Sequence, residues 1–418
     1  MERRKERILL CLCHLSGNEQ KFVQEAFDTN WVVPLGPNVN GFEKDLEEFV
    51  GQNKRVVALS AGTAAVHLGL LACGVGPCDE VLVQSFTFCA SSHPVTYLGA
   101  TPVFIDSEKE TWNMDPELLE EAIKDRIAKT GKKPKAIVPV ALYGMPYQID
   151  RIMEIANRYG IPVVEDAAEG FGSKFNGQVL GTFGKYGVLS FNGNKMITTS
   201  GGGALITANE QEWREIMMFA TQYRESYPYY QHEKIGYNYR MSNICAGIGR
   251  GQMTIANDHI AHHKHVQKMY EDLLKDVPGI KVHSQPATGE YDSNYWLCTI
   301  TIDENVKVKG QEKAYNQVVT GAVGGASGVI HTAQSAHTDC EPNANVEAMR
   351  LGLDAMNIEA RPLWKPMHKH PVYHGAPAYV NGVSETLFKV GMCLPAGPYV
   401  CDDDVLFICD VIKELIVR

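Results

Sequence analysis

The chain has 418 residues, of which 44% are apolar, and this length suits a soluble enzyme with one large and one smaller domain better than a small binding module. Its 39 basic and 49 acidic residues give a formal net charge of −10 without a basic stripe or an arginine-rich tract, which argues against nucleic acid as a partner. No apolar run reaches the ~20 residues that a membrane-spanning helix needs, and the eleven cysteines form no CxxC pair, so we expect a reducing, cytoplasmic location.

The predicted elements begin with the apolar stretch ILLCL, which we expect to form a buried strand because the small-residue cleavage pattern of a signal peptide is absent. From about residue 55 to 210, short apolar runs alternate with amphipathic segments. The runs that predict strands are RVVALS, EVLVQSF, TPVFID, AIVPVAL, IPVVED, YGVLSF and ALITAN. Between them, a helix is predicted to begin after Asp115 as N-cap, with Pro116 at its first position, and to end at Gly131. This alternation indicates an α/β fold with a mainly parallel sheet.

The pattern changes beyond about residue 265. Longer helices and antiparallel-looking runs such as YWLCTITI predict a second, smaller α+β domain. We therefore predict a large domain over residues 1–265 and a small C-terminal domain over residues 266–418. Residues 306–342 are rich in Gly, Ala, Ser and Thr, which predicts a long loop inserted in the small domain.

Residues with chemical potential follow three of the predicted strands. Gly62 and Thr63 open a helix after RVVAL and offer backbone N–H groups and the helix dipole to a phosphate. Asp166 ends IPVVED, and Ser190 and Lys195 lie at and beyond the end of YGVLS. Because ligands of open α/β sheets bind at the carboxyl ends of the strands, we expect these residues to share one crevice.

Lys195 does not belong to either of two common nucleotide-binding motifs. A Walker A loop places its lysine between Gly and Ser or Thr, whereas Asn194 precedes Lys195 and Met196 follows it. The GxGxxG fingerprint of dinucleotide-binding proteins is also missing after the first strand. Both chemistries are therefore disfavoured.

The same residues match four chemical features of pyridoxal phosphate (PLP): its phosphate, its ring nitrogen, its aldehyde and its flat ring. The helix N-terminus and the Ser190 hydroxyl suit its phosphate, Asp166 suits a protonated ring nitrogen, and Lys195 suits its aldehyde. Phe88, in SFTF after another strand, suits its flat ring. Each residue alone also has a structural explanation, such as a helix cap, a turn carboxylate or a core aromatic. Their joint arrangement predicts the cofactor.

Five segments in chain order carry a resemblance to a known family: SAGTAAVHL, SFTFCAS, EDAAEGFGS, SFNGNKMITTSGGGAL and GYNYRMSNICAGIG. Together they resemble the DegT/DnrJ nucleotide-sugar aminotransferases, which are PLP enzymes of fold type I, the aspartate aminotransferase-like fold. The segments ARPLWKPMH and CLPAG look most like the branch that acts on UDP-linked 4-keto-6-deoxy-N-acetylhexosamines, as in bacillosamine-type glycan precursors.

The resemblance implies roles for the site residues. Lys195 would carry the Schiff base to PLP and act as a base once it is freed, and Asp166 would hold the pyridine nitrogen protonated. Glu169, where many relatives have Gln, would lie near the cofactor's ring oxygen. Asn238 would reach the phosphate of the neighbouring subunit's cofactor, which implies a homodimer with shared active sites. The remaining implied contacts are those of Gly62, Thr63 and Ser190 with the phosphate and of Phe88 with the ring.

The implied reaction takes an amino group from L-glutamate and, through pyridoxamine phosphate, passes it to C4 of the keto sugar with ping-pong kinetics. Trp31, Arg240 and His368 are candidate contacts of the sugar nucleotide. For Arg240 a structural ion pair, and for His368 a place in the core, remain open alternatives.

Other functions also remain open. One alternative is an enzyme of the same family that aminates C3 or uses a GDP- or dTDP-linked sugar. A non-catalytic regulatory protein on the same fold is an alternative of another class. Lys195 argues against the family branch that has histidine there and removes a hydroxyl group.

Two histidine-containing groups invite a metal, and we predict none. His259 and His263 have the i, i+4 spacing of a helical metal site but lack a carboxylate-bearing signature. The second group consists of His331, His337, Asp339 and Cys340.

Overall fold

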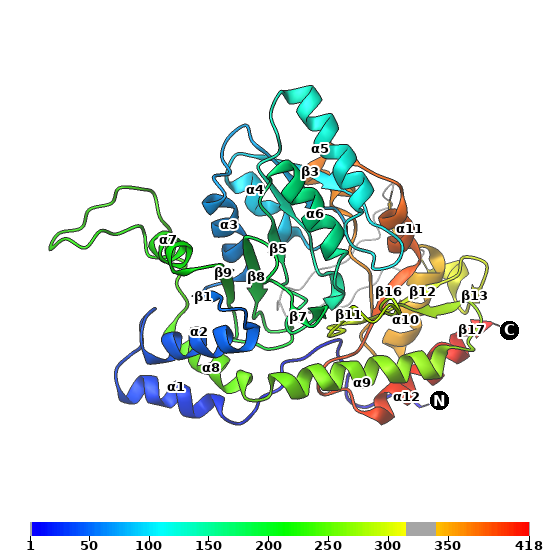
Figure 1. Cartoon of the computed structure of the whole chain (residues 1–418). Coiled ribbons are helices and arrows are strands. Elements are labelled where there is room, and N and C mark those ends of the chain that lie inside the picture. Colours follow the sequence, from blue (N-terminus) through cyan, green and yellow to red (C-terminus); the bar gives the residue numbers. More distant parts are fainter. Residues whose placement is uncertain (1, 315–339, 418) are drawn as a thin grey trace.

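The computed structural model describes residues 2–314 and 340–417 (Figure 1). Its large body is built around one central sheet, and a smaller body carries an antiparallel sheet. The helices of the large body are α1 (Glu19–Asp28), α2 (Pro37–Val50), α3 (Gly62–Ala72), α4 (His93–Tyr97), α5 (Pro116–Thr130), α6 (Ile149–Tyr159), α7 (Glu210–Ala220) and α8 (Asn243–Met253). The helix α9 (Ala256–Leu274) leads to α10 (Ala344–Ala355), α11 (Val383–Val390) and α12 (Asp402–Leu415).

The central sheet joins two groups of four strands. In one group the order is β15–β3–β2–β4 and all pairs are parallel; in the other it is β5–β8–β9–β1, where β9 is antiparallel to both neighbours. Parallel bridges between Ile137 and Val163 and between Val140 and Asp166 connect the groups. The strands are β1 (Arg55–Leu59), β2 (Glu80–Gln84), β3 (Thr101–Ile105), β4 (Ala136–Val138), β5 (Val164–Asp166), β8 (Tyr186–Ser190), β9 (Gly203–Thr207) and β15 (Ala378–Tyr379).

All seven strands predicted between residues 55 and 210 are present, and the mainly parallel α/β sheet is confirmed. The predicted helix after Asp115 is also confirmed: the Asp115 carboxylate accepts hydrogen bonds from two backbone N–H groups of the first turn, and Gly131 ends the helix with φ of 70°.

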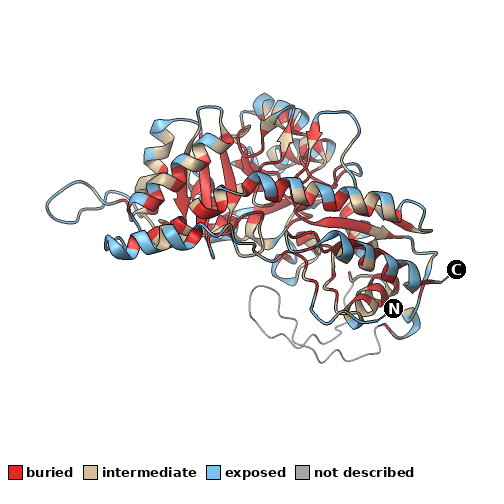
Figure 2. Ribbon diagram, turned by 90° about the horizontal axis from the view of Figure 1, so that it is seen from below, coloured by how far each residue is buried: buried red, intermediate tan, exposed pale blue. Residues whose placement is uncertain are grey.

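Apolar side chains on both faces of the strands hold the sheet in place. In β1, Val56 and Ala58 join one buried cluster with α2, whereas Val57 and Leu59 join another with α3. Because successive side chains of a strand point to opposite faces, an apolar run is buried on both sides only when helices cover both. Figure 2 shows the strands as buried between helices.

The smaller body has a sheet of order β10–β12–β16–β14 with antiparallel pairs. A buried cluster of its own packs this sheet against α10, α12 and the second half of α9. Its strands are β10 (Ile280–Val282), β12 (Cys298–Ile302), β14 (Arg361–Pro362) and β16 (Gly391–Leu394). The minor strands are β6 (Lys174–Phe175), β7 (Gln178–Val179), β11 (Tyr291–Asp292), β13 (Lys307–Val308) and β17 (Ile416–Val417).

The two bodies exchange segments. Ile8 bridges to Ile358 and belongs to the buried cluster of the smaller body, whereas Leu10 and Cys11 belong to that of the large one. The apolar N-terminal stretch thus runs between the two bodies, and it forms a single bridge and no full strand. Conversely, β15 adds to the edge of the large sheet. The predicted boundary between residues 265 and 266 falls inside α9, which runs from one body to the other (Figure 1).

Two further expectations concern loops and membranes. Of the loop predicted over residues 306–342, the described part includes β13 and a 3₁₀ turn at Gln311–Lys313, and residues 315–339 lie outside the described part. In residues 2–314 and 340–417, no helix combines the length and the apolar character that crossing a bilayer requires.

Candidate active site

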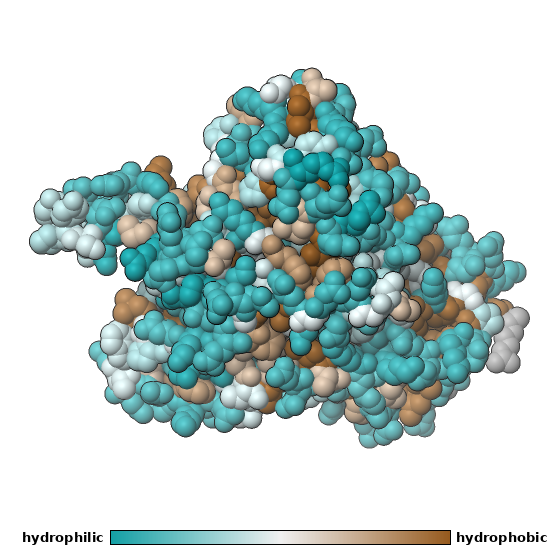
Figure 3. Space-filling model, in the orientation of Figure 1, coloured by the Kyte–Doolittle hydropathy of each residue, from teal (hydrophilic) through white to brown (hydrophobic). Residues whose placement is uncertain are grey.

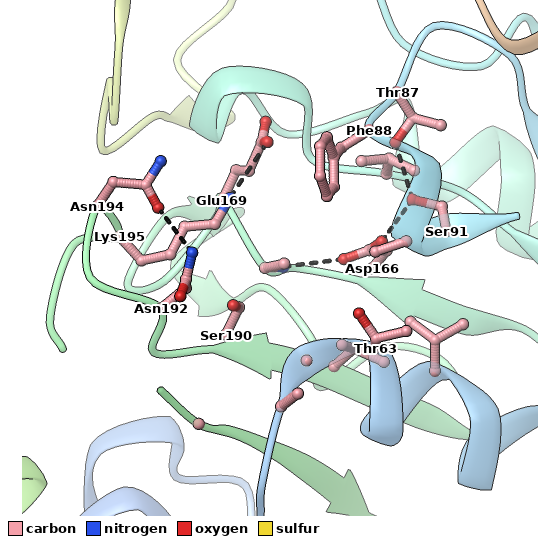
Figure 4. Close-up of a pocket in the computed structure, with 18 of the residues that line it drawn as sticks. Thr63, Thr87, Phe88, Ser91, Asp166, Glu169, Ser190, Asn192, Asn194 and Lys195 are labelled. Carbon is pink, nitrogen blue, oxygen red and sulfur yellow. Dashed lines mark hydrogen bonds and ion pairs between the residues drawn. The ribbon is translucent and has the colours of Figure 1, made fainter. Parts of the chain in front are cut away.

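A cavity of about 370 Å³ lies at the carboxyl ends of β2, β5 and β8, beside the first turn of α3 (Figure 4). The structure brings into its lining every predicted cofactor residue except Asn238. These residues are Gly62, Thr63, Phe88, Asp166, Glu169, Ser190 and Lys195. The sheet therefore collects the strand ends in one place, as its topology predicts.

Asp166 is a buried carboxylate at the end of β5. Its Oδ2 accepts a 2.6 Å hydrogen bond from the Ser91 hydroxyl, and its Oδ1 accepts one of 3.1 Å from the Ala168 backbone N–H. Burial raises the pKa of Asp166, and these hydrogen bonds and the charge of Lys195 oppose that rise. Desolvation of a carboxylate is best offset by a cation in contact with it, so this site suits a protonated ring nitrogen.

Lys195 reaches into the cavity from the loop after β8. Its Nζ lies 3.3 Å from Glu169 Oε1, and the two side chains are only 13% and 4% exposed (Figure 4). The other Glu169 oxygen accepts a 2.7 Å hydrogen bond from the Tyr143 N–H. Burial raises the pKa of Glu169, whereas the charge of Lys195 and the Tyr143 N–H lower it. Lys195 is therefore an amine held by a carboxylate at the end of the sheet.

The first turn of α3 is shaped to receive an anion. Ala61 is its N-cap and provides no side-chain cap, and the turn has no acidic residue. A Cβ at Gly62 would lie 2.9 Å from the Cβ of Ser190, and one at Gly203 would lie 2.4 Å from the backbone nitrogen of Gly62. Glycine at both positions thus lets β9 and the end of β8 pass close to the helix end. Free N–H groups, the helix dipole and the Ser190 hydroxyl together fit a phosphate.

These observations fit PLP. The cavity has an anion site at α3, a buried carboxylate without an ion-pair partner among the described residues at Asp166, an amine at Lys195 and an aromatic face at Phe88. The absence of a side chain at Gly62 also lets the Ser190 hydroxyl lie beside the helix end, where a phosphate would bind.

Several lining residues were not predicted from the sequence. Ser91 lies in SFTFCAS, close in the chain to the predicted Phe88. Its place beside the cavity could therefore have been predicted from that segment. Trp296 and Trp364 come from the C-terminal part of the chain and pack with the buried cluster of the large body, and no local pattern places them beside Lys195. The other lining residues that were missed include Ser60, Thr87, Asn192 and Asn194.

The three candidate substrate contacts do not line the cavity. Arg240 forms a buried ion pair with Glu43, at 2.5 Å between Nη1 and Oε1, and also donates to the Ala58 carbonyl oxygen at 3.0 Å. The structural alternative therefore describes Arg240 in this chain, because its charge is already neutralised. Trp31 lies on the surface, where its carbonyl oxygen accepts a hydrogen bond from the Asn243 amide.

His368 lies behind the loop that carries Phe88, not in the cavity. Its Nδ1 is 2.6 Å from the Ser85 hydroxyl, and its Nε2 is 3.2 Å from Glu385 Oε1. Both ring nitrogens are thus engaged within the chain, and the contact of His368 with the sugar stays a prediction.

Asn238 pairs with Thr221 in an antiparallel bridge at the surface, away from the cavity of its own subunit. Its predicted contact is with the cofactor of a second subunit, and it stays a prediction.

The helical histidines contact backbone carbonyls. His259 Nδ1 is 3.0 Å from the Met196 carbonyl oxygen, and His263 Nδ1 is 3.2 Å from that of Tyr295. Burial lowers the pKa of His263 to about 3. The described residues contain no group of three side chains arranged to hold a metal ion. His331, His337 and Asp339 of the second group lie outside the described residues, whereas Cys340 is buried.

Comparison with known proteins identifies the family. The model of the DegT/DnrJ/EryC1/StrS aminotransferase family matches residues 14–333. The chain is 39% identical over 414 residues to the putative pyridoxal phosphate-dependent aminotransferase EpsN of Bacillus subtilis, covering 98% of this chain and 96% of that protein. It is 33% identical over 402 residues to the GDP-perosamine synthase of Escherichia coli O157:H7, covering 96% of each.

Solved structures agree with this relationship. A DegT DnrJ EryC1 StrS aminotransferase from Brucella abortus superposes with a TM-score of 0.82 at 28% identity, covering 96% of each chain. The chain therefore belongs to the DegT/DnrJ/EryC1/StrS aminotransferase family and is a PLP-dependent transaminase with a fold of type I.

Proposed function

We propose that this enzyme transfers the amino group of L-glutamate to C4 of a UDP-linked 4-keto-6-deoxy-N-acetylhexosamine. The observation that carries the proposal is the placement of Lys195, buried Asp166 and the free first turn of α3 around one cavity. Lys195 would bind the PLP aldehyde covalently, Asp166 would face the ring nitrogen, and Gly62, Thr63 and Ser190 would hold the phosphate. When bound, PLP supplies an electron sink for the breaking C–H bond.

The residues of the chain account for the remaining chemistry. The Asp166 carboxylate, oriented by Ser91 and the Ala168 N–H, keeps a proton on the ring nitrogen because a cation there offsets its own burial. The Lys195 amine, once free, takes a proton from the donor's Cα and later returns one to C4 of the sugar. Glu169 accepts a hydrogen bond from that amine at 3.3 Å and so keeps it within the cavity.

The choice of sugar nucleotide rests on the segment ARPLWKPMH. Trp364 in this segment lines the cavity, and its ring centroid lies 5.3 Å from that of Phe88. The segment that resembles the UDP-sugar branch therefore contributes to the wall of the site. A GDP-linked 4-keto sugar is the second candidate, favoured by the similarity to GDP-perosamine synthase over nearly the whole chain.

Mass spectrometry of the product separates these candidates. The purified protein is incubated with PLP, L-glutamate and, in parallel, UDP-4-keto-6-deoxy-N-acetylglucosamine, GDP- and dTDP-linked 4-keto-6-deoxyhexoses and a 3-keto nucleotide sugar, with Lys195→Ala as the control. We expect the amino sugar from the UDP-linked 4-keto substrate only. If only the GDP-linked sugar gained an amino group, the proposed substrate would be wrong and the GDP-linked sugar would take its place. If no sugar gained an amino group, the non-catalytic alternative would be favoured.

We also propose that two copies of the chain share their active sites. Residues 221–238 form an arm that projects from the body beside α7 (Figures 1 and 3), and its two edges pair through Thr221 with Asn238 and Arg224 with His232. The arm exposes Tyr230 to 78% and Ile235 to 84%. Exposed apolar groups of this kind are typical of interaction surfaces.

A second exposed apolar segment adjoins the arm. Residues 31–35 include the exposed side chains of Trp31, Val32, Val33 and Leu35. A groove that Leu35, Gln222 and Asn238 line connects this segment with the base of the arm. Both segments would be covered in a homodimer, and Asn238 would then face the cofactor of the second copy, as the family resemblance implies.

A further inference from the structure

Trp296 contacts both the backbone just before Lys195 and the Lys195 amine. Its indole N–H donates a 2.7 Å hydrogen bond to the carbonyl oxygen of Asn194, the residue that precedes the lysine. The Lys195 Nζ also lies 3.9 Å from the centroid of the Trp296 ring, and Trp296 is only 1% exposed. One side chain from a distant part of the chain therefore contacts both the backbone that precedes this lysine and its amine.

Asn294 ties Trp296 to the other partner of the amine. Its side-chain oxygen accepts a 2.8 Å hydrogen bond from the Trp296 backbone N–H, and its amide donates to the carbonyl oxygens of Glu169 and Phe171, each at 2.9 Å. A Cβ at Gly144 would collide with the Asn294 side-chain oxygen, so glycine there leaves this amide its place. Trp296 and Glu169 are thus fixed relative to each other, although they lie far apart in the chain.

The two partners present complementary chemistry to one amine. Glu169 offers a carboxylate oxygen at 3.3 Å, and Trp296 offers the negative face of an aromatic ring. Both attract a cationic group, and both act at short range on a side chain that is only 13% exposed. A lysine side chain without such partners would sample many rotamers.

We propose that Trp296 is a catalytic residue that, together with Glu169, forms a resting site for the Lys195 amine whenever this amine is not bonded to the cofactor. The inference rests on the proposed role of Lys195. The resting site keeps the amine within reach of the reacting carbon and returns it to the same position after each half-reaction. Its aromatic part covers one side of the amine and limits how easily reagents from solution reach it.

The test measures the reactivity of Lys195 in the protein without PLP. The apoprotein is treated briefly with trace acetic anhydride at pH 7, and peptide mass spectrometry gives the acetylation rate of Lys195 relative to that of Lys21, an exposed lysine on α1. Trp296→Phe keeps an aromatic face and loses the indole N–H. Trp296→Leu loses both, and Trp296→Met serves if the leucine variant does not fold, because methionine fills irregular space without a π face.

We expect Lys195 to be acetylated about threefold faster or more in Trp296→Leu and in Glu169→Gln, and within about twofold of the wild-type rate in Trp296→Phe. An unchanged rate in the folded Leu or Met variant would overturn the proposal. So would a Phe variant as reactive as the Leu variant, because the indole hydrogen bond and not the ring face would then be responsible. Whether Lys195 carries PLP is decided separately, by borohydride reduction of the wild-type holoprotein, so the two ideas can fail independently.

Discussion

The Ser91 hydroxyl donates a 2.6 Å hydrogen bond to Asp166, and the same hydroxyl lies 2.8 Å from that of Thr87. The loop after β2 thereby holds the carboxylate at the end of β5. Because this hydrogen bond is one of the interactions that oppose the rise in the pKa of Asp166 on burial, its loss would raise that pKa further.

Ser91→Ala is therefore expected to retain PLP but to lower kcat about tenfold, as a lost hydrogen bond to a charged group costs about 1.5–3 kcal/mol. The acid limb of the kcat profile should also move to higher pH, since a raised pKa leaves less Asp166 ionised. Steady-state kinetics between pH 5 and 9 measure both effects. Ser92→Ala is the matched control, because the Ser92 hydroxyl donates to the Cys89 carbonyl oxygen and not to Asp166. Equal losses in the two variants would contradict this role.

The buried ion pair of Arg240 and Glu43 is expected to be structural. Arg240→Met leaves a carboxylate buried without its partner and should lower the free energy of unfolding by about 3–5 kcal/mol, with little effect on the KM for the sugar nucleotide. Arg250→Met breaks the more exposed pair with Asp45 and should cost no more than about 1 kcal/mol. Urea unfolding and initial rates give the two quantities. A raised KM with unchanged stability would instead support Arg240 as a contact of the sugar nucleotide.

His283 is expected to make stability depend on pH. It stacks on Trp112 at 3.7 Å between ring centroids, and burial lowers its pKa from 6.5 to about 3. A histidine with a depressed pKa stabilises the fold above pH 6.5, and this contribution is lost as the pH falls from 6.5 toward 3, by up to about 1.4 kcal/mol per pH unit.

His283→Phe keeps an aromatic ring against Trp112 and removes the titration. Between pH 7 and 5 it should therefore lose about 2 kcal/mol less unfolding free energy than the wild type does. The exposed His265→Gln is the control. Parallel stability curves for the wild type and His283→Phe would show that His283 binds no additional proton on unfolding.

Mixing two inactive variants tests the shared active site. Lys195→Ala lacks the amine and Asn238→Ala lacks the residue that we expect to reach the second subunit. In a mixed dimer, one site has an intact Lys195 and receives Asn238 from its partner, so random exchange should restore about a quarter of wild-type activity. The variants are co-refolded or co-expressed and assayed, with each variant alone as the reference. A mixture no more active than the separate variants would contradict the exchange of Asn238.

The sequence predicts the parts of the site that lie next to a strand in the chain. Gly62, Asp166 and Lys195 each follow a strand, and the period and length of the apolar runs place those strands in one sheet, so their meeting follows from topology. The helix Pro116–Thr130 could also be predicted from the sequence, because its capping residue and its terminal glycine directly adjoin it in the chain.

Contacts between distant segments could not be predicted in this way. Trp296 reaches Lys195 only because a segment about a hundred residues further along the chain folds back into the large body, and Arg240 finds Glu43 across the interior between β1 and α2. His368 likewise has the residue type of a substrate contact, but tertiary packing gives both of its ring nitrogens other partners. A single sequence does not reveal which charged or polar side chain will be neutralised by a remote partner.

The covalent attachment of PLP tests the central claim most directly. The holoprotein is reduced with borohydride and digested, and peptide mass spectrometry identifies the lysine that carries the pyridoxyl group. We expect the modification on Lys195 and none in the Lys195→Ala variant. A pyridoxyl group on another lysine, or one retained in Lys195→Ala, would contradict the assignment of this cavity as the catalytic centre.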